Sequence, residues 1–373
     1  MALFNRNDRS LLGIWWWTVD KWMLALTVLL AVVGVFLVMA ASPPVAERIN
    51  LSDQHFVIRH GIFLSVSMLA MLCFSMLSHR QIRILSLIAL FGSMLLIGMS
   101  IMIGPEIKGA SRWIPFGPIK IQPSEFVKPF FIVVNAWLLS LWRDNKNFPG
   151  WKISIGILAL LLGLLLMQPD VGMSILVVIT WSFQIFLAGM PLAIVILLVG
   201  IVAPVSLYSA YTFLPHVADR IEKFMAGGGM QAKYAMRSFA NGGLFGVGPG
   251  EGVFKYHLPD AHADFIFAVA GEEFGLIFCI LLIGLFATIM FRGFHHAFEN
   301  AGNIFLILAI GGISLQLGVQ AAIHIASSVH IMPTKGMTLP FISYGGSSLL
   351  ATGISLGILL ALTRQYQQSG RPI

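Results

Sequence analysis

The chain has 373 residues, of which 57% are hydrophobic and 10% are charged, and its formal net charge is +7. Soluble domains carry roughly 25% charged residues, so this composition excludes an ordinary soluble protein and indicates an integral membrane protein. Apolar runs of about 20 residues recur between clusters of Pro, Gly and charge, which favours α-helical spans over the short alternating strands of a membrane barrel.

The apolar runs predict an all-α polytopic membrane protein with ten transmembrane helices in one domain, residues 22–363. The predicted spans are Trp22 to Ala41, Phe56 to Leu77, Ile84 to Ile103, Phe126 to Trp142, Ile153 to Met167, Val171 to Ala188, Leu192 to Tyr208, Phe265 to Phe291, Ile304 to Ala326 and Phe341 to Leu362. An even number of spans places both tails, residues 1–21 and 364–373, on one side, which we take as cytoplasmic. A large extracytoplasmic loop, residues 209–263, then separates helices 7 and 8. Cys73 and Cys279 both fall inside spans, so no disulfide is expected.

The distribution of positive charge is more informative than its total. With the tails cytoplasmic, eleven of the 23 Lys and Arg residues lie inside, so a simple count does not fix the orientation. Nine of the outer twelve gather in two loops, as Lys108, Arg112, Lys120 and Lys128, and as Arg220, Lys223, Lys233, Arg237 and Lys255. Such clusters indicate a site for an anionic ligand.

Two outer turns carry acidic residues, and for each residue both a structural role and a binding role are open. Glu125 and Lys128 lie three residues apart at the start of the fourth span and share a helix face. They form either a local ion pair on a capped helix or part of an anion site with Arg112 and Lys120. Asp170 either caps the sixth span or faces the same cleft.

The segment from His257 to Glu273 combines Asp260, His262, Asp264, Glu272 and Glu273 at the start of an apolar span. Charged carboxylates are costly in a membrane, so we expect this segment to face a polar cleft. The preceding glycine-rich loop lacks the strand and the Gly-Lys-Ser/Thr of a nucleotide site; its glycines favour close backbone packing and re-entrant segments. The two histidines indicate zinc only weakly, because no further metal-ligand spacing accompanies them.

The ninth span carries Gln316, Gln320 and His324 on one helix face, for which hydrogen bonding between helices is the default interpretation. The loop that follows adds Lys335 and several hydroxyl groups, among them that of Ser343.

Five motifs in this order resemble the SEDS family (shape, elongation, division and sporulation), and the match covers nearly the whole chain. They are Ser111-Arg112-Trp113-Ile114, Gln122-Pro123-Ser124-Glu125, Gln168-Pro169-Asp170, Leu258-Pro259 through Phe265, and Pro333 to Ser348. The last motif and Lys255 are more similar to the division type than to the elongation type. One departure is His262-Ala263-Asp264-Phe265, where the family has His-Thr-Asp-Phe; the hydroxyl is missing and the carboxylate is retained.

The resemblance implies a peptidoglycan glycosyltransferase that polymerises lipid II at the outer face of the cytoplasmic (inner) membrane, at the division septum. It also implies three kinds of partner: a class B penicillin-binding transpeptidase, other division proteins and membrane lipids. No nucleic acid partner is expected. Such a reaction requires a base for the acceptor hydroxyl, and both the residues and the resemblance point to Asp264. Displacement would invert the anomeric centre in one step. The substrate-binding candidates, toward lipid II and the undecaprenyl-diphosphate-linked glycan, are Arg112, Trp113, Lys120, Gln122, Glu125, Lys128, Asp170, Arg237, Lys255, His262, Lys335 and Ser343.

The sequence leaves open whether a divalent cation, Mg²⁺ or Mn²⁺, joins these residues. It also leaves two rival functions, a lipid II flippase or transporter and a non-catalytic scaffold of the division machinery. Catalysis predicts a carboxylate clustered with cations on one face, whereas transport predicts polar residues distributed through the membrane midplane. The outer-face charges favour catalysis, and Glu272, Glu273, Gln316 and Gln320 keep transport open.

Overall fold

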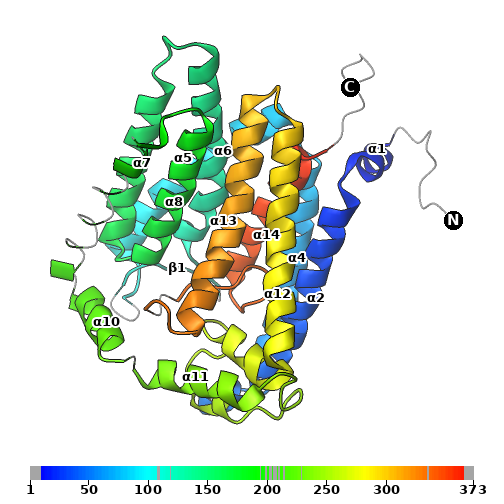
Figure 1. Ribbon diagram of the computed structural model, residues 1–373, viewed down its shortest axis with the longest axis vertical. Coiled ribbons are helices and arrows are strands. Elements are labelled where there is room, and N and C mark those ends of the chain that lie inside the picture. The colour runs from blue at the N-terminus through cyan, green and yellow to red at the C-terminus, as the bar shows by residue number, and fades with distance from the viewer. Residues whose placement is uncertain are drawn as a thin grey trace.

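The computed structural model describes residues 10–106, 110–117, 119–193, 195–197, 200, 204, 208, 211–212, 215–227, 229–333 and 336–364. They form a bundle of roughly parallel and antiparallel helices (Figure 1). The helices are α1 (Leu11–Thr18), α2 (Lys21–Ala41), α3 (Pro43–Arg48), α4 (His55–Ser75), α5 (His79–Ile103), α6 (Pro123–Asp144), α7 (Gly150–Met167), α8 (Val171–Leu187), α10 (Pro215–Met225), α11 (Met230–Gly242), α12 (Ile266–Glu299), α13 (Ile304–Ser328) and α14 (Gly346–Leu362). A short antiparallel hairpin, β1 (Ile114–Phe116) and β2 (Ile119–Ile121), and a 3₁₀ turn, η1 (Phe254–His257), complete the described elements.

Within these described ranges, seven helices are long and apolar enough to cross a membrane, and α8 and α14 are shorter apolar helices. These nine coincide with nine of the predicted spans, so the prediction of a multi-span α-helical protein is confirmed. The remaining predicted span, Leu192 to Tyr208, lies largely outside the described residues. The count of ten transmembrane helices therefore stays a prediction.

Local sequence signals explain where several of these helices begin. The Asp20 carboxylate caps α2 by accepting hydrogen bonds from the amides of Trp22 (3.0 Å) and Met23 (3.2 Å). Ser78 and Gln81 form a reciprocal capping box at the start of α5. Pro123 occupies the first turn of α6, where its missing N–H costs nothing. Helix starts are thus set by short polar motifs between the apolar runs.

The bundle has two chemically different ends. At the terminal end, Arg364 donates to the Thr18 hydroxyl (3.0 Å), so the described parts of the two chain ends lie together. There Asp20 also accepts hydrogen bonds from Arg292 (2.6 and 2.7 Å) and contacts His296 (2.6 Å). Burial alone would raise the pKa of Asp20, but the hydrogen bonds from His296 and Arg292 outweigh burial and hold this pKa far below its usual value.

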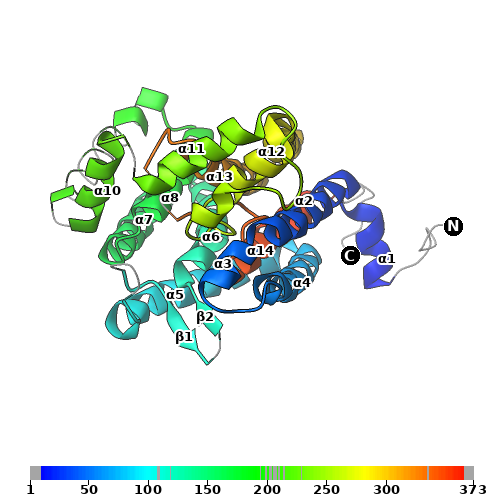
Figure 2. The ribbon, with the colours of Figure 1, turned by 90° about the horizontal axis from the view of Figure 1, so that it is seen from below.

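The opposite end, which we call the hairpin end, carries β1–β2, α3, α11 and the segment between η1 and α12 (Figure 2). We expect this end to face outward. In a variant with Cys73 and Cys279 replaced by alanine, a membrane-impermeant thiol reagent added outside cells should label Ser52→Cys at the hairpin end and miss Asn145→Cys. Both positions are exposed, so accessibility alone does not separate them. Labelling of the second site only would invert the orientation.

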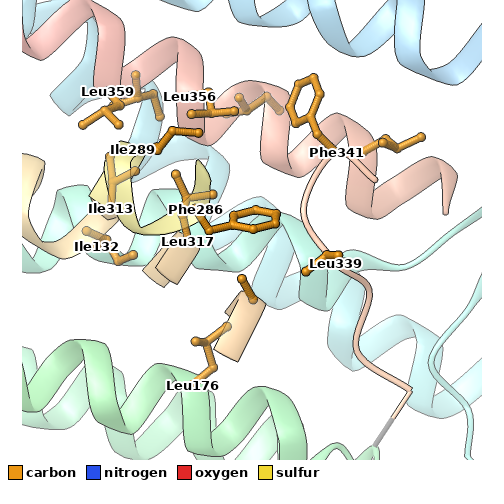
Figure 3. Close-up of a cluster of buried hydrophobic side chains, with 14 of the residues drawn as sticks. Ile132, Leu176, Phe286, Ile289, Ile313, Leu317, Leu339, Phe341, Leu356 and Leu359 are labelled. Atoms are coloured by element: carbon orange, nitrogen blue, oxygen red, sulfur yellow. The ribbon is translucent and has the colours of Figure 1, made fainter. Parts of the chain in front are cut away.

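The core lies between α6, α8, α12, α13 and α14 (Figure 3). Phe286 and Ile289 of α12 face Ile313 and Leu317 of α13, with Leu356 of α14 on the far side. All five side chains are at least nine-tenths buried. Leu339 and Phe341, from the loop before α14, close the hairpin end of this core, so that loop is part of the packed interior.

Several helix boundaries differ from the predicted spans, and those of α14 and α12 have clear physical reasons. Helix α14 begins at Gly346, five residues later than predicted, because Phe341 has a positive φ of 62° and lies buried in the preceding turn. Helix α12 runs eight residues beyond the predicted end at Phe291, to Glu299. Hydrophobicity alone predicts neither boundary. It does not distinguish the buried turn before α14 from a membrane span, and it does not show that a helix continues through the polar residues at the end of α12.

The loops also contain more regular structure than expected. The predicted large loop, 209–263, contains α10, α11 and η1. The loop after α5 contains the β1–β2 hairpin, so the all-α description needs this small exception. Helix α11 packs against α12 at the hairpin end of the bundle (Figure 1). The Phe239 and Phe267 rings lie 5.8 Å apart in that contact.

Helix α12 is interrupted at Gly275, whose φ of 81° and ψ of −179° fit only glycine. The residues that follow α11 fill the interruption. The amides of Val247 and Gly248 donate to the carbonyls of Glu272 and Glu273, both at 3.0 Å. In return, the amides of Leu276 and Ile277 donate to the carbonyls of residues 243 and 244, at 2.9 and 3.2 Å. The expectation that these glycines allow close backbone packing is therefore confirmed.

Candidate active site

Asp264 lies in the turn that leads into α12. The amides of Ala263 and Asp264 both donate to the Asp260 carbonyl, at 2.9 and 3.0 Å, and Asp260 itself has a positive φ of 54°. The Asp264 side chain is half-buried. It points toward Gly336, since a Cβ placed on that glycine would lie 3.5 Å from Asp264 Oδ2. The loop between α13 and α14 therefore forms one wall beside this carboxylate.

That loop is fastened to the Asp264 segment by two hydrogen bonds. The Tyr344 amide donates to the His262 carbonyl (2.9 Å), and the Ser343 hydroxyl donates to the Ala263 carbonyl (2.7 Å). The Ser343 oxygen also accepts from the Leu339 amide (2.9 Å). Ser343 is buried, and its hydroxyl both donates and accepts hydrogen bonds within the protein. We call this connection between the two loops the Ser343 clasp.

The predicted pairing of Glu125 with Lys128 is present, with 2.7 Å between Oε2 and Nζ. Both residues are buried. Lys128 also donates to Gln320 Oε1 (2.9 Å), and Gln320 Nε2 donates to the Thr338 carbonyl (3.0 Å). The expected hydrogen bonding between helices by Gln320 is thus confirmed. These contacts join α6 and α13 to the same loop that holds the Asp264 segment.

Arg112 closes the turn between α7 and α8. Its Nε and Nη2 donate to the carbonyls of Gln168 (3.2 Å) and Pro169 (2.5 Å), and its Nη1 lies 3.9 Å from the Asp170 carboxylate. The Asp170 carboxylate accepts a hydrogen bond from the Met173 amide (3.3 Å), so Asp170 caps α8, which is one of its two predicted roles. Arg112 and Asp170 are therefore brought together, and most of the guanidinium is directed at the protein itself.

The other candidates of this loop surround the start of α6. The Gln122 amide donates to the Ser347 hydroxyl of α14 (3.0 Å), and its side chain donates to Ser124 (3.2 Å). Trp113 is half-buried just before β1, and Lys120 is exposed on β2. Of these three residues, Lys120 is the one that offers its charged group to solvent.

His262 packs between aromatic rings, with centroids 4.4 Å from Phe56 and 4.9 Å from Tyr344. Burial lowers the pKa of His262 to about 4, and the opposing effect of Asp260 is smaller. The ring is thus neutral near pH 7 and supplies no positive charge. Arg59 hydrogen-bonds the Tyr344 side chain, and it is not among the site residues predicted from the sequence. Its position within an apolar span was the available signal.

The remaining predicted cations have different environments. Lys255 is buried and forms an ion pair with Glu273 at 2.6 Å, whereas Arg237 is exposed on α11. Lys335 lies outside the described residues. Among the residues that the structure does describe, no three His, Cys, Asp or Glu side chains come together to hold a metal ion.

Comparison with known proteins gives one consistent family. Residues 20–368 match the FtsW/RodA/SpoVE family of cell cycle proteins. A Caulobacter vibrioides protein named "probable peptidoglycan glycosyltransferase FtsW" is 43% identical over 366 residues, which cover 97% of this chain and 93% of that protein. A Coxiella burnetii protein of the same name is 35% identical, covering 94% and 98%.

Solved structures share the fold. The structure of the rod shape determining protein RodA from Thermus thermophilus superposes with a TM-score of 0.70 at 26% identity, covering 95% of this chain and 99% of that chain. A chain from a structure described as "structural coordination of polymerization and crosslinking by a peptidoglycan synthase complex" gives a TM-score of 0.76 at 24% identity. It covers 92% of this chain and 97% of that chain.

Proposed function

The chain belongs to the FtsW/RodA/SpoVE family of cell cycle proteins, and from this premise we propose that it polymerises lipid II into glycan strands at the outer face of the cytoplasmic membrane. It is a peptidoglycan glycosyltransferase, the activity by which its curated relatives are named. The observation that carries the catalytic assignment is the placement of Asp264. Its carboxylate sits half-buried at the hairpin end, on a turn held by the clasp of Ser343 and the Tyr344 amide.

Asp264 is proposed as the general base. A base within hydrogen-bond reach of the acceptor hydroxyl takes its proton as the new glycosidic bond forms, and this contributes typically 10²- to 10⁴-fold to the rate. The lipid-linked diphosphate leaves from the opposite side of the anomeric carbon, so one displacement inverts the configuration. A second carboxylate nucleophile is not required for this step.

The hairpin end is suited to the negative charge that develops on the leaving diphosphate. Helices α6, α8, α12 and α14 all begin there, so their partially positive ends lie at this end of the bundle (Figure 1). Exposed Lys120 and Arg237 and the nearby Arg59 add full charges, and Lys335 remains a candidate from its sequence position. Lys128 is less suited to direct binding, because Glu125 already neutralises it.

We assign the biological setting from the family. The division-type motifs support action at the septum with a class B penicillin-binding transpeptidase and other division proteins. One similar fold was solved as part of a peptidoglycan synthase complex, which accords with such a partner.

Purified protein reconstituted with lipid II, with and without the transpeptidase, should produce glycan strands that are visible by gel electrophoresis. Movement of lipid II across the vesicle membrane without strands would instead support a transporter. Neither activity, with retained binding of the transpeptidase, would support a scaffold.

The Glu125–Lys128 pair provides a further prediction. Removing one partner leaves a buried unpaired charge, which typically costs about 3 to 5 kcal/mol of stability, so single variants do not separate stability from catalysis. The double variant Glu125→Gln, Lys128→Met removes both charges. We expect it to unfold at a temperature close to wild type and to polymerise lipid II at least about tenfold more slowly, because Lys128 no longer holds Gln320 and, through it, the loop beside Asp264. A displacement of about 1 Å at a reacting group costs on the order of 100-fold in rate. Wild-type turnover in the double variant would reduce the pair to a structural role.

A further inference from the structure

Helix α12 consists of two pieces separated at Gly275. The first piece, Ile266–Phe274, which we call the half-helix, has Asp264 two residues before its start and Glu272 and Glu273 near its end. Gly275 interrupts the helical backbone hydrogen bonds of α12. The longer second piece, which follows Gly275, therefore does not by itself fix the direction of the half-helix. The position of Asp264 therefore depends on whatever holds these nine residues.

The half-helix is held from one side by residues Gly242–Gly252, which we call the glycine loop. Besides the four backbone hydrogen bonds at the break, the contact is so close that a Cβ at Gly242 would lie 2.0 Å from the Gly271 carbonyl oxygen. A Cβ at Gly246 would lie 2.2 Å from the Glu273 carbonyl oxygen. Backbone-to-backbone contacts of this kind leave little freedom for the two segments to slide.

Glu272 extends the attachment to the residues that follow the glycine loop. Its Oε1 accepts hydrogen bonds from the amides of Val253 (2.8 Å) and Phe254 (2.9 Å) and from the side chain of Asn241 (3.1 Å). The residue is fully buried. One carboxylate oxygen thus gathers the end of α11, the start of η1 and the half-helix at a single point.

Glu273 connects the half-helix to the rest of the bundle through Lys255. The Lys255 ammonium donates to Glu273 Oε1 (2.6 Å), to the Gly250 carbonyl (2.9 Å) and to the Ala40 carbonyl in the last turn of α2 (3.0 Å). An ammonium group has three N–H donors, and all three are used here. The cation also lies at the partially negative end of α2, which stabilises it further.

We propose that Lys255, Glu272 and Glu273 are positioning residues that fix the half-helix, and thereby the Asp264 carboxylate, against the loop that contains Gly336. Lys255 accordingly acts through Glu273, and this replaces its assignment as a ligand of the substrate diphosphate. The inference rests on the proposed role of Asp264 as the base. A displacement of about 1 Å at a reacting group costs on the order of 100-fold in rate, so a loosened half-helix reduces catalysis without removing any group that touches substrate.

The test compares Lys255→Met with the double variant Lys255→Met, Glu273→Gln. The single variant leaves the Glu273 carboxylate buried and unpaired, whereas the double variant removes both charges. In the reconstituted full-length protein, the single variant should lower kcat on the order of 100-fold with little change in the KM for lipid II. The kcat of the double variant should be at least about tenfold higher than that of the single variant. Glu251→Gln, an exposed acid of the glycine loop, serves as the control and should behave as wild type.

Amide hydrogen exchange of residues 266–274 provides a readout that does not depend on activity. Exchange should rise in Lys255→Met and return toward wild type in the double variant. Wild-type exchange in Lys255→Met overturns the proposal, and so does a raised KM that Glu273→Gln does not restore, because that pattern indicates a substrate ligand. An error in the role of Asp264 would show separately, as retained activity in an Asp264 variant with normal exchange.

Discussion

Asp264→Asn is expected to abolish polymerisation of lipid II while the protein still folds and still binds its transpeptidase partner. Asparagine keeps the size of the side chain, and the turn is held by backbone groups of residues 260–264 and by the Ser343 clasp. Basicity is the property that is lost, and a general base contributes typically 10²- to 10⁴-fold. The measurement is strand synthesis by the purified variant, together with its thermal unfolding in the same detergent.

The matched control for this prediction is again Glu251→Gln, which removes one negative charge from the same end of the molecule at an exposed position. It should retain activity, which excludes a general loss of negative charge as the cause. Strand synthesis by Asp264→Asn at the wild-type rate would disprove the base assignment. A large fall in its unfolding temperature would instead identify Asp264 as a structural residue.

Gly275→Ala is expected to produce the largest loss of stability among single substitutions considered for this chain. The added Cβ would lie 2.4 Å from the Gly246 nitrogen and 2.5 Å from the Leu244 carbonyl oxygen, both backbone atoms that cannot move independently. Alanine is also strained at the φ of 81°. Expelling the glycine loop would remove four backbone hydrogen bonds at about 0.5 to 1.5 kcal/mol each. Together these losses approach the whole stability of a typical domain, about 5 to 15 kcal/mol.

Gly284→Ala in the same helix is the control, because nothing lies within 4 Å of a Cβ at that position. Alanine has the better helix propensity, so this variant should be as stable as wild type or slightly more stable. The two variants are compared by yield of monodisperse protein and by unfolding temperature. Equal behaviour would show that the glycine loop is not firmly seated in the break of α12.

The apolar spans could be predicted from the sequence because membrane insertion imposes length and hydrophobicity directly. The break at Gly275 could not, since an isolated glycine in an apolar run is compatible with an uninterrupted helix. Its conformation depends on Leu244 and Gly246, which are some thirty residues away and reach it only in the folded chain. The early start predicted for α14 has a related cause, because buried Phe341 is as apolar as a residue of a span.

In the candidate site, too, local sequence predicted some contacts, whereas others depend on residues far apart in the chain. Local spacing correctly predicted that Glu125 pairs with Lys128, and it placed Asp264 at a helix start. The partners of Arg112 and Lys255 depend on loops and helices distant in sequence, and charge counting treated both as ligand-binding cations. In the structure each satisfies carbonyl groups of the protein, those of Gln168 and Pro169 for Arg112 and that of Ala40 for Lys255. These carbonyl partners are set by tertiary contacts, which charge counting does not show.

The contact of Asp20 with Arg292 and His296 has a consequence for biosynthesis. Asp20 precedes the first span, and its partners lie more than 270 residues later, at the far end of α12. During translation the first helix is therefore inserted before Arg292 and His296 exist, and until then Asp20 has only its capping hydrogen bonds to the amides of Trp22 and Met23. Its contact with α12 is completed late, so a chain terminated before Arg292 would contain every earlier span and still lack both of these partners of Asp20.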